Sequence, residues 1–413
     1  MDPLNGLPVE ILTDIALHLR PGDLSKLIRT CKHLSVVVTP LLWGDIETHS
    51  GSHHESYVEH DDSPPFRHPS QRSYHISPSL VHMIGTMRRL DHSRLRVVAA
   101  RVKNLCLFTL FDPQIFNLLP HFTNLETFEL DISCDIRMDM GPYTYKAAFE
   151  SPALPKLRFA KMFGYLPYQL VKWILGSTST LERVEVGILD RSTLTYSGFL
   201  HRGWLDPERM PDFIPSGLEV LPRLRHLHLC QPSSNESRDD DDYQGFGMNT
   251  CTWSSHAEGV SLEAWRRVLE ASKQTLEILV LEQRPEIDCQ DDTPWRSMMN
   301  LSSGSGSKAL VDMLESTILD KEDFPVLRKV YLYGIVVRQG PDGKPMENTP
   351  GGRLMRRLEQ RGVACEARFG TWTWYNYMQG SAEWVLNYKE QESDEGSDGS
   401  EQKMRWDSVL AKV

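Results

Sequence analysis

A short leucine motif that recurs between residues 102 and 332 constrains the fold of this chain more than any other feature. Its core is Leu-x-x-Leu-x-Leu, with other apolar residues allowed at each position. The last two apolar positions are two residues apart, as residues on one face of a strand are. The side chain at the first position is expected to point into the core just before the strand begins. We predict one strand for each copy. The copies are Val102-Leu105-Leu107, Leu125-Phe128-Leu130, Leu157-Ala160-Met162, Leu181-Val184-Val186, Leu224-Leu227-Leu229, Leu276-Leu279-Leu281 and Leu327-Val330-Leu332.

Helical stretches separate several of these copies, so the pattern alternates strand and helix. The predicted helices span 113–119, 168–175, 262–273 and 308–317, and another is expected over 353–361. This alternation resembles the leucine-rich repeats, in which one unit cannot bury its own apolar face and neighbours must stack. The copies begin 23, 32, 24, 43, 52 and 51 residues apart, whereas regular repeats run about 20–29 residues. We predict an α/β fold: an irregular leucine-rich-repeat-like solenoid with insertions.

A doubly wound α/β sheet is the alternative, because strand–helix alternation serves both architectures. Two observations favour the solenoid. Several copies are led by proline, as in Leu154-Pro155-Lys156-Leu157, and the chain has no G-x-x-x-x-G-K-[ST] phosphate loop. A last strand over 363–368 and the aromatic residues that follow it are expected to cover the open edge of the repeats. A ligand-binding aromatic patch is the other interpretation of that cluster.

Residues 1–48 hold three short apolar stripes at helical spacing. Pro8 suits the first turn of a helix, and Pro21-Gly22 ends that helix before Asp23, which is predicted to cap a second one. Pro40 is expected to kink or end the third helix. The stripes are Ile11, Leu12, Ile15 and Leu19; Leu24, Leu27, Ile28 and Cys31; and Leu34, Val37, Val38, Leu41 and Leu42. Helices this short bury little surface, so the block is expected to lean on a partner or on the rest of the chain.

The order and spacing of this block resemble an F-box. The matching residues are Leu7, Pro8, Glu10, Ile11, Leu12, Ile15, Leu19, Asp23, Leu24, Leu27, Cys31, Leu34, Pro40, Leu41 and Trp43. The resemblance implies docking on a Skp-type adaptor, which links to a cullin scaffold and a RING subunit. It implies that Leu7, Pro8, Ile11, Leu12 and Ile15 face the adaptor, with Leu24, Leu27 and Leu34 shared between the small core and that interface. The alternative is an ordinary three-helix cap on a larger domain.

The segments around these two parts have other compositions. Residues 49–96 are expected to be a linker that ends in a connector helix over 79–90, because their first part is rich in His, Ser, Pro and acidic residues. Residues 97–388 form the predicted recognition domain. Residues 389–413 are expected to be an acidic, disordered tail, since their first part cannot bury enough apolar surface to order itself.

The insertions between the later copies contain large aromatic residues. In repeat proteins insertions map to loops on one face, often the binding face, and exposed aromatics are common interface anchors. We predict a substrate-binding surface that contains Trp204, Tyr243, Phe246 and Trp253. The alternative is that these side chains pack the insertions onto the solenoid.

Composition excludes several function classes. The formal net charge of −11 argues against nucleic-acid binding, and no apolar run is long enough to predict a membrane span. The cysteines are scattered without a Cys-x-x-Cys pair, which fits a reducing, cytoplasmic or nuclear setting. We predict no catalytic, metal or cofactor site. The resemblance implies a substrate-receptor subunit of a Skp–cullin–F-box ubiquitin ligase; the alternative is a scaffold or interaction protein that binds the adaptor without delivering substrates.

Overall fold

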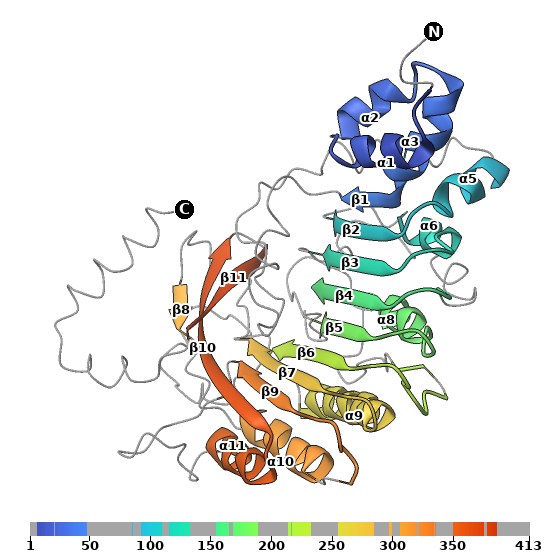
Figure 1. The fold of residues 1–413 in the computed structure, drawn as a ribbon. Helices are drawn as coiled ribbons and strands as arrows, with labels where there is room; N and C mark the ends of the chain where they lie inside the picture. Colours follow the sequence, from blue (N-terminus) through green and yellow to red (C-terminus); the bar gives the residue numbers. More distant parts are fainter. Residues whose placement is uncertain are drawn as a thin grey trace, which may run out of the picture.

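The computed structural model describes residues 6–19, 21–47, 85, 92–109, 115–132, 154–164, 168–188, 214–215, 217–232, 255–284, 297–299, 306–319, 322–333, 335, 350–375 and 378–385. In these residues the fold is α/β, as predicted: strands are stacked across a long sheet and helices lie beside it (Figure 1). The predicted connector helix lies outside the described residues except for Gly85, and the predicted tail lies wholly outside them.

The strands follow one another across the sheet in the order of the chain. The order is β1-β2-β3-β4-β5-β6-β7-β9-β10-β11, and β8 pairs with β10. Pairs from β1 to β10 are parallel, whereas β8 and β11 run antiparallel to β10. A doubly wound sheet reverses its strand order at a switch point, and the described strands have no such reversal. The strands are β1 (Asp45–Glu47), β2 (Asn104–Thr109), β3 (Thr127–Ile132), β4 (Phe159–Gly164), β5 (Arg183–Ile188), β6 (His226–Pro232), β7 (Ile278–Arg284), β8 (Ser297–Met299), β9 (Lys329–Tyr333), β10 (Ala364–Tyr375) and β11 (Met378–Val385).

Each leucine motif forms one of these strands, as predicted, and the copies align in register. The middle motif position pairs from strand to strand along Leu105, Phe128, Ala160, Val184, Leu227, Leu279 and Val330. All three motif positions are buried in every copy, and Leu327 is the most exposed of them at 6%. Since side chains two residues apart in a strand lie on one face, the motif supplies the core face of the sheet.

Helices complete that core. Figure 1 shows α5, α6, α8 and α9 gathered on one side of the stack of strands. Apolar helix residues such as Val171, Ile174 and Val268 share one buried cluster with the motif residues. The helices are α5 (His92–Ala99), α6 (Ile115–Leu118), α8 (Tyr168–Leu175), α9 (Ser255–Ser272), α10 (Gly306–Ile318) and α11 (Pro350–Arg361), with a 3-10 turn at Leu119–His121. The prediction for 168–175 is confirmed at both ends, while α9 begins seven residues before the predicted 262–273.

Charged residues occupy the position immediately before each of seven parallel strands, and their sign alternates from strand to strand. We call Lys103, Glu126, Arg158, Glu182, Arg225, Glu277 and Arg328 the charge ladder. The backbone N–H of each later member donates to the carbonyl of the member before it, at 2.7–3.0 Å. Arg158 donates two hydrogen bonds to Glu182, at 2.9 and 2.8 Å, and the Glu277 carboxylate lies 3.6 Å from Arg225 Nε and 3.5 Å from Arg328 Nε.

The charge ladder favours the observed order of strands. The hydrogen bond from Arg158, followed by the fields of Arg158, Arg223 and Arg225, holds the pKa of Glu182 below its usual range despite partial burial. A strand that skipped its neighbour would place like charges side by side, and this is destabilising. The alternation therefore supports sequential stacking over a crossover.

The N-terminal block forms three helices, α1 (Val9–Leu17), α2 (Pro21–Leu27) and α3 (Lys32–Gly44). One detail differs from prediction. Asp23 lies inside the first turn of α2, which begins at Pro21, because proline fits the first helical position without the loss of a hydrogen bond. The third helix continues through Pro40; the carbonyl that loses its donor there belongs to Val36, which is 75% exposed and so within reach of water.

The third helix leads directly into the sheet, which the sequence did not indicate. β1 follows α3 without a break and pairs with β2, Ile46 opposite Leu105. Trp43 and Ile46 pack against the main core, whereas Ala16, Leu24 and Val38 form a small core of their own. The three-helix block is therefore joined to the first edge of the sheet by packed, hydrogen-bonded residues.

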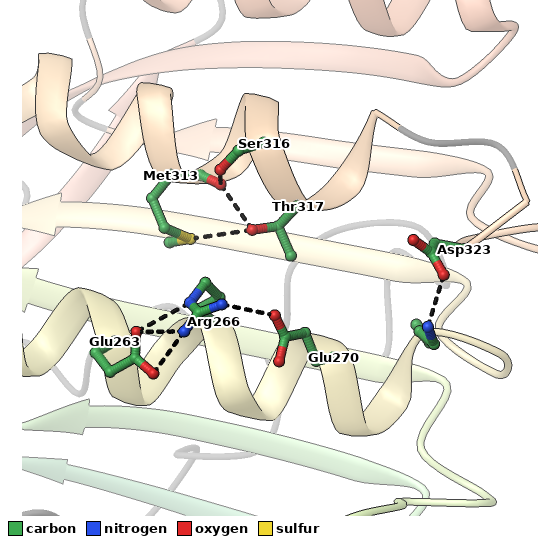
Figure 2. Close-up of polar contacts among 8 residues, drawn as sticks. Glu263, Arg266, Glu270, Met313, Ser316, Thr317 and Asp323 are labelled. Carbon is green, nitrogen blue, oxygen red and sulfur yellow. Dashed lines mark hydrogen bonds and ion pairs between the residues drawn. The ribbon is translucent and has the colours of Figure 1, made fainter.

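Polar contacts brace the last helices, and Figure 2 shows those within α9 and the one from the end of α9 to Asp323, which precedes β9. On α9, Arg266 contacts Glu263 at 2.7 Å and Glu270 at 3.0 Å, and Lys273 at the end of this helix reaches Asp323 at 2.6 Å. Glu315 on α10 accepts hydrogen bonds from Arg353 and Arg357 on α11, both at 2.9 Å. α11 ends as predicted at Gly362, whose φ of +85° allows Val363 N–H to donate to the Leu358 carbonyl.

Candidate functional site

The N-terminal block carries an apolar surface that its own core does not use. On α1 the side chains of Leu12 and Ala16 point into the block and are buried. On the same helix Val9, Ile11, Ile15 and Leu17 are 43–63% exposed, and Val36 on α3 is 75% exposed. Exposed apolar residues that share one face of a helix mark interaction surfaces. Ile11 and Ile15, four residues apart, lie on one face of the helix.

The residues predicted to contact an adaptor divide into two groups by burial. Pro8, Ile11 and Ile15 are exposed, and Leu7 and Leu27 are half-buried. Leu12, Leu24 and Leu34 are 2–6% exposed. Leu24 and Leu34 were predicted to be shared between the small core and the adaptor interface, and their burial agrees with the core part of that prediction. Leu12 was expected on the docking face and is instead buried, because it lies one turn before Ala16 on the inward side of α1.

The opposite face of the sheet carries polar residues in two rows that run across the strands. The outer row is Thr127, Phe159, Arg183, His226, Ile278 and Lys329, the first residue of each strand, and all are half-buried. The inner row lies two residues further on and consists of Glu129, Lys161, Glu185, His228, Val280 and Tyr331. From Lys161 to Tyr331 the inner row is at most 5% exposed. Burial of so many ionisable groups is costly unless they are paired.

Polar contacts involve several members of the two rows. His228 Nε2 lies 2.9 Å from a carboxylate oxygen of Glu282 on β7, with both side chains fully buried. Lys161 Nζ lies 3.6 Å from Glu129 Oε2. Arg183 donates through Nε to Glu185 Oε1, and its guanidinium lies 5.3 Å from the centre of the Phe159 ring. These contacts hold Arg183 and Glu185 in fixed positions on β5.

One buried polar atom of each of Arg183, Glu185 and His226 has no hydrogen-bond partner among the residues that the structure describes. These atoms are Arg183 Nη2, Glu185 Oε2 and His226 Nε2. Burial, followed by the positive charge of Arg183 and by His228 and Arg328, holds the pKa of His226 well below its usual range, so its ring is neutral at pH 7. Two adjacent strands therefore carry a buried hydrogen-bond donor on Arg183, a buried acceptor on Glu185 and the neutral imidazole of His226.

The predicted substrate-binding residues Trp204, Tyr243, Phe246 and Trp253 lie outside the described residues. The predicted last strand over 363–368 is observed as β10, which begins one residue later, at Ala364, and continues to Tyr375. Trp372 and Trp384 lie on the antiparallel β10–β11 pair. Sequence reasoning missed the polar group of Arg183, Glu185, His226, His228 and Glu282. The x positions of the leucine motif place these residues on the other face, but nothing in the motif predicts their burial.

Two further properties concern only the part of the chain that the structure describes. It contains no group of three or more His, Cys, Asp or Glu side chains arranged to bind a metal ion. None of its helices has the length and apolar character needed to cross a membrane.

Comparison with known proteins was negative: no protein-family model matches the chain, and no curated protein does.

Proposed function

We propose that this protein is the substrate-receptor subunit of a Skp–cullin–F-box ubiquitin ligase. The observation that carries the proposal is the apolar face of α1. Ile11 and Ile15, which the F-box resemblance assigns to the adaptor interface, are 45% and 43% exposed, although the same helix packs Leu12 and Ala16 inward. Leaving two isoleucines half in water on a packed helix is unfavourable unless a partner covers them. We infer that a Skp-type adaptor is this partner and that it links the chain to a cullin scaffold.

We further propose that the sheet is an irregular leucine-rich-repeat-like solenoid that recognises the substrate. Three observations support this: the sequential parallel strands, the helices gathered on one side in Figure 1, and one buried leucine motif per repeating strand. In such folds each unit packs only on its neighbours, and the stack offers an extended surface on which a partner can bind. The charge ladder supports the same stacking.

The proposed mechanism is proximity. An adaptor on α1 and a substrate on the sheet would be held by one continuous structure, because α3 passes into β1 and Trp43 packs on the main core. A substrate held near a charged ubiquitin-conjugating enzyme reacts at a raised effective concentration. In this proposal the chain itself performs no chemistry, needs no cofactor and acts in the cytoplasm or nucleus.

Affinity capture of the full chain from cells tests the proposal. Wild-type protein is expected to retain a Skp-type adaptor and a cullin, and proteins that accumulate on it after proteasome inhibition are candidate substrates. The variant Ile11→Asp with Ile15→Asp is expected to lose both adaptor and cullin. Val220→Asp is the matched control, because Val220 is 58% exposed but lies before β6, far along the chain from α1.

The outcomes separate the alternatives. Equal adaptor recovery by wild type and the double variant would exclude α1 as the docking face. Recovery of the adaptor without a cullin would favour the scaffold function over the ligase function.

A further inference from the structure

The turns that precede the strands carry a second row of basic side chains beside the charge ladder. The backbone N–H groups of Val102, Leu157 and Leu224 each donate to the carbonyl three residues earlier, at 3.1, 3.5 and 3.3 Å, and so close a four-residue turn. The third residues of these turns are Arg101, Lys156 and Arg223. Lys156 and Arg223 are exposed, and Arg101 is half-buried. A basic side chain therefore lies at the edge of the sheet before β2, β4 and β6, which are alternate strands.

The units between them use the same position to connect neighbouring units. Asn124 donates through Nδ2 to the carbonyl of Ala100 in the preceding unit, at 2.6 Å. Thr275 donates through Oγ1 to the carbonyl of Leu224 in the preceding unit, at 2.8 Å. The side chains of the three basic turn residues make no hydrogen bond or ion pair within the part of the chain that the structure describes. Their charges are therefore available to a partner.

The charge ladder adds to this positive charge. Each basic turn residue is followed two positions later by a basic member of the ladder, and we call the resulting pairs the basic stations: Arg101 with Lys103, Lys156 with Arg158, and Arg223 with Arg225. The basic strip consists of these stations and of Glu126 and Glu182, the ladder members between them. Its six basic and two acidic residues leave a net charge of +4, whereas the whole chain has a formal net charge of −11. The strip should therefore attract an anionic partner that the rest of the chain repels.

The spacing of the stations selects the kind of partner. Backbone hydrogen bonds of 2.7–2.9 Å link the ladder members from Lys103 to Arg225, so the stations follow the strand spacing. Neighbouring strands lie about 4.8 Å apart, which places stations on alternate strands about 10 Å apart. An extended polypeptide advances about 10 Å in three residues. Each strand of a DNA duplex instead carries a charge about every 3.4 Å, and an acidic chain is a poor partner for nucleic acid.

We propose that the basic strip binds an extended, acidic segment of a partner protein that carries Asp or Glu at every third residue. Each station holds one carboxylate, so three stations take three successive acidic residues. Pro155 and Pro222 occupy the second position of two of the turns, where the fixed φ of proline suits the turn and limits backbone motion. Lys156 and Arg223 therefore extend from rigid turns, which lowers the entropy lost on binding. The proposal rests on the proposed function only in identifying this partner as the substrate.

Synthetic peptides test the proposal on the full chain. The probes are fluorescently labelled, amidated heptapeptides whose binding is measured by anisotropy: a spaced peptide, Glu-Ser-Ser-Glu-Ser-Ser-Glu; a block peptide, Glu-Glu-Glu-Ser-Ser-Ser-Ser; and a neutral peptide, Gln-Ser-Ser-Gln-Ser-Ser-Gln. Surface ion pairs are individually weak, so the three stations together are expected to bind the spaced peptide about tenfold more tightly than the neutral one and about threefold more tightly than the block one. Both preferences should disappear at about 1 M NaCl, where the screening length is about 3 Å.

Charge reversals locate the binding surface. Lys156→Glu and Arg223→Glu each change an exposed residue without an ion pair and are expected to weaken binding of the spaced peptide about fivefold. Lys308→Glu, the same charge change at an exposed residue of α10, is the matched control and should leave the affinity unchanged. Thermal unfolding of each variant identifies any that does not fold, and the two reversals are independent tests of the strip.

The outcomes decide between the possibilities. Binding of the spaced peptide that is no tighter than that of the other two, or that neither reversal weakens, would overturn the proposal. A ten-nucleotide oligothymidine that binds more tightly than the spaced peptide and loses affinity in the same variants would overturn it in favour of a nucleic-acid site. If the peptide preference is absent while wild-type protein still retains the adaptor, the basic strip fails and the ligase proposal stands. If the preference is present while no adaptor is retained, the strip stands and the ligase proposal fails.

Discussion

Reversal of one charge in the ladder before the strands should destabilise the protein in a way that a second reversal partly repairs. Glu277 is the best position, because its carboxylate lies 3.6 Å from Arg225 Nε and 3.5 Å from Arg328 Nε. The side chains are 34%, 72% and 58% exposed, so each pair is a surface pair and is worth about 0.2–1 kcal/mol. Loss of both pairs in Glu277→Gln should lower the free energy of unfolding by about 1 kcal/mol.

Glu277→Arg should cost more, because attraction becomes repulsion on both sides. Two like charges about 4 Å apart in water repel by about 1 kcal/mol, so the total loss should be about 3 kcal/mol at low salt. Arg328→Glu in the same chain restores one opposite pair, and 328 is the last charged position of the ladder, since Val363 precedes β10. The double variant should therefore be more stable than the sum of the single changes predicts, by about 1–2 kcal/mol.

Urea unfolding of wild type, Glu277→Gln, Glu277→Arg, Arg328→Glu and the double variant measures these differences. The measurements are made at about 0.05 M and about 1 M NaCl, because the screening length falls to about 3 Å at 1 M salt and the effects should shrink there. Additive losses that do not change with salt would show that the alternation of charges has no electrostatic role in the stacking.

Two further predictions concern single residues. The pKa of His226 is held low in the folded protein, so below about pH 6.5 the unfolded chain binds a proton that the folded one does not, and stability should fall on acidification. This residue contributes at most about 1.4 kcal/mol per pH unit to the pH dependence of the free energy of unfolding. The loss of stability between pH 7.5 and pH 5.5, measured by urea unfolding, should therefore be smaller in His226→Gln than in wild type. Equal losses in the two proteins would contradict the role of His226. Gly362→Ala should destabilise by about 1 kcal/mol, since φ is +85° and a Cβ there would meet nothing within 4 Å, so the cost is conformational. Gly22→Ala, inside α2 and equally open, should instead stabilise by about 0.5–1 kcal/mol, and melting temperatures that move in the same direction would refute this reasoning.

The strands could be predicted from the sequence because the apolar positions of the leucine motif are the buried positions of each strand. Leu227 and Leu229 alternate with polar residues in the sequence, and the structure buries both on the core face. β1 was not predictable in the same way, since Asp45–Glu47 has one apolar residue and gains its strand conformation only from pairing with β2. Of the two outcomes predicted for Pro40, a kink or an end, the end does not occur, because helix packing outweighs one lost hydrogen bond.

The sequence predicted the exposed residues of α1 better than the buried polar residues of the sheet. The pattern around Ile11 and Ile15 indicated a docking helix, and the exposure of both agrees with that role, but the spacing alone could not place Leu12 on the inward side. Burial of Glu185 and His228 depends on what the whole fold brings near the sheet, so a sequence that shows polar residues at alternate positions predicts a solvated face. Only the register of β5 and β6 brings Arg183 next to His226.

The affinity of the purified full chain for a purified Skp-type adaptor tests the central proposal most directly. Covering the exposed half of Ile15 should contribute about 1 kcal/mol, and an aspartate there adds the cost of a buried, unpaired charge. Ile15→Asp should therefore weaken binding by at least about 100-fold, while Val220→Asp, a change at a similarly exposed site, should leave the dissociation constant unchanged. Binding that is absent in wild type, or that Ile15→Asp does not weaken, would contradict the assignment of α1 as the adaptor-docking helix.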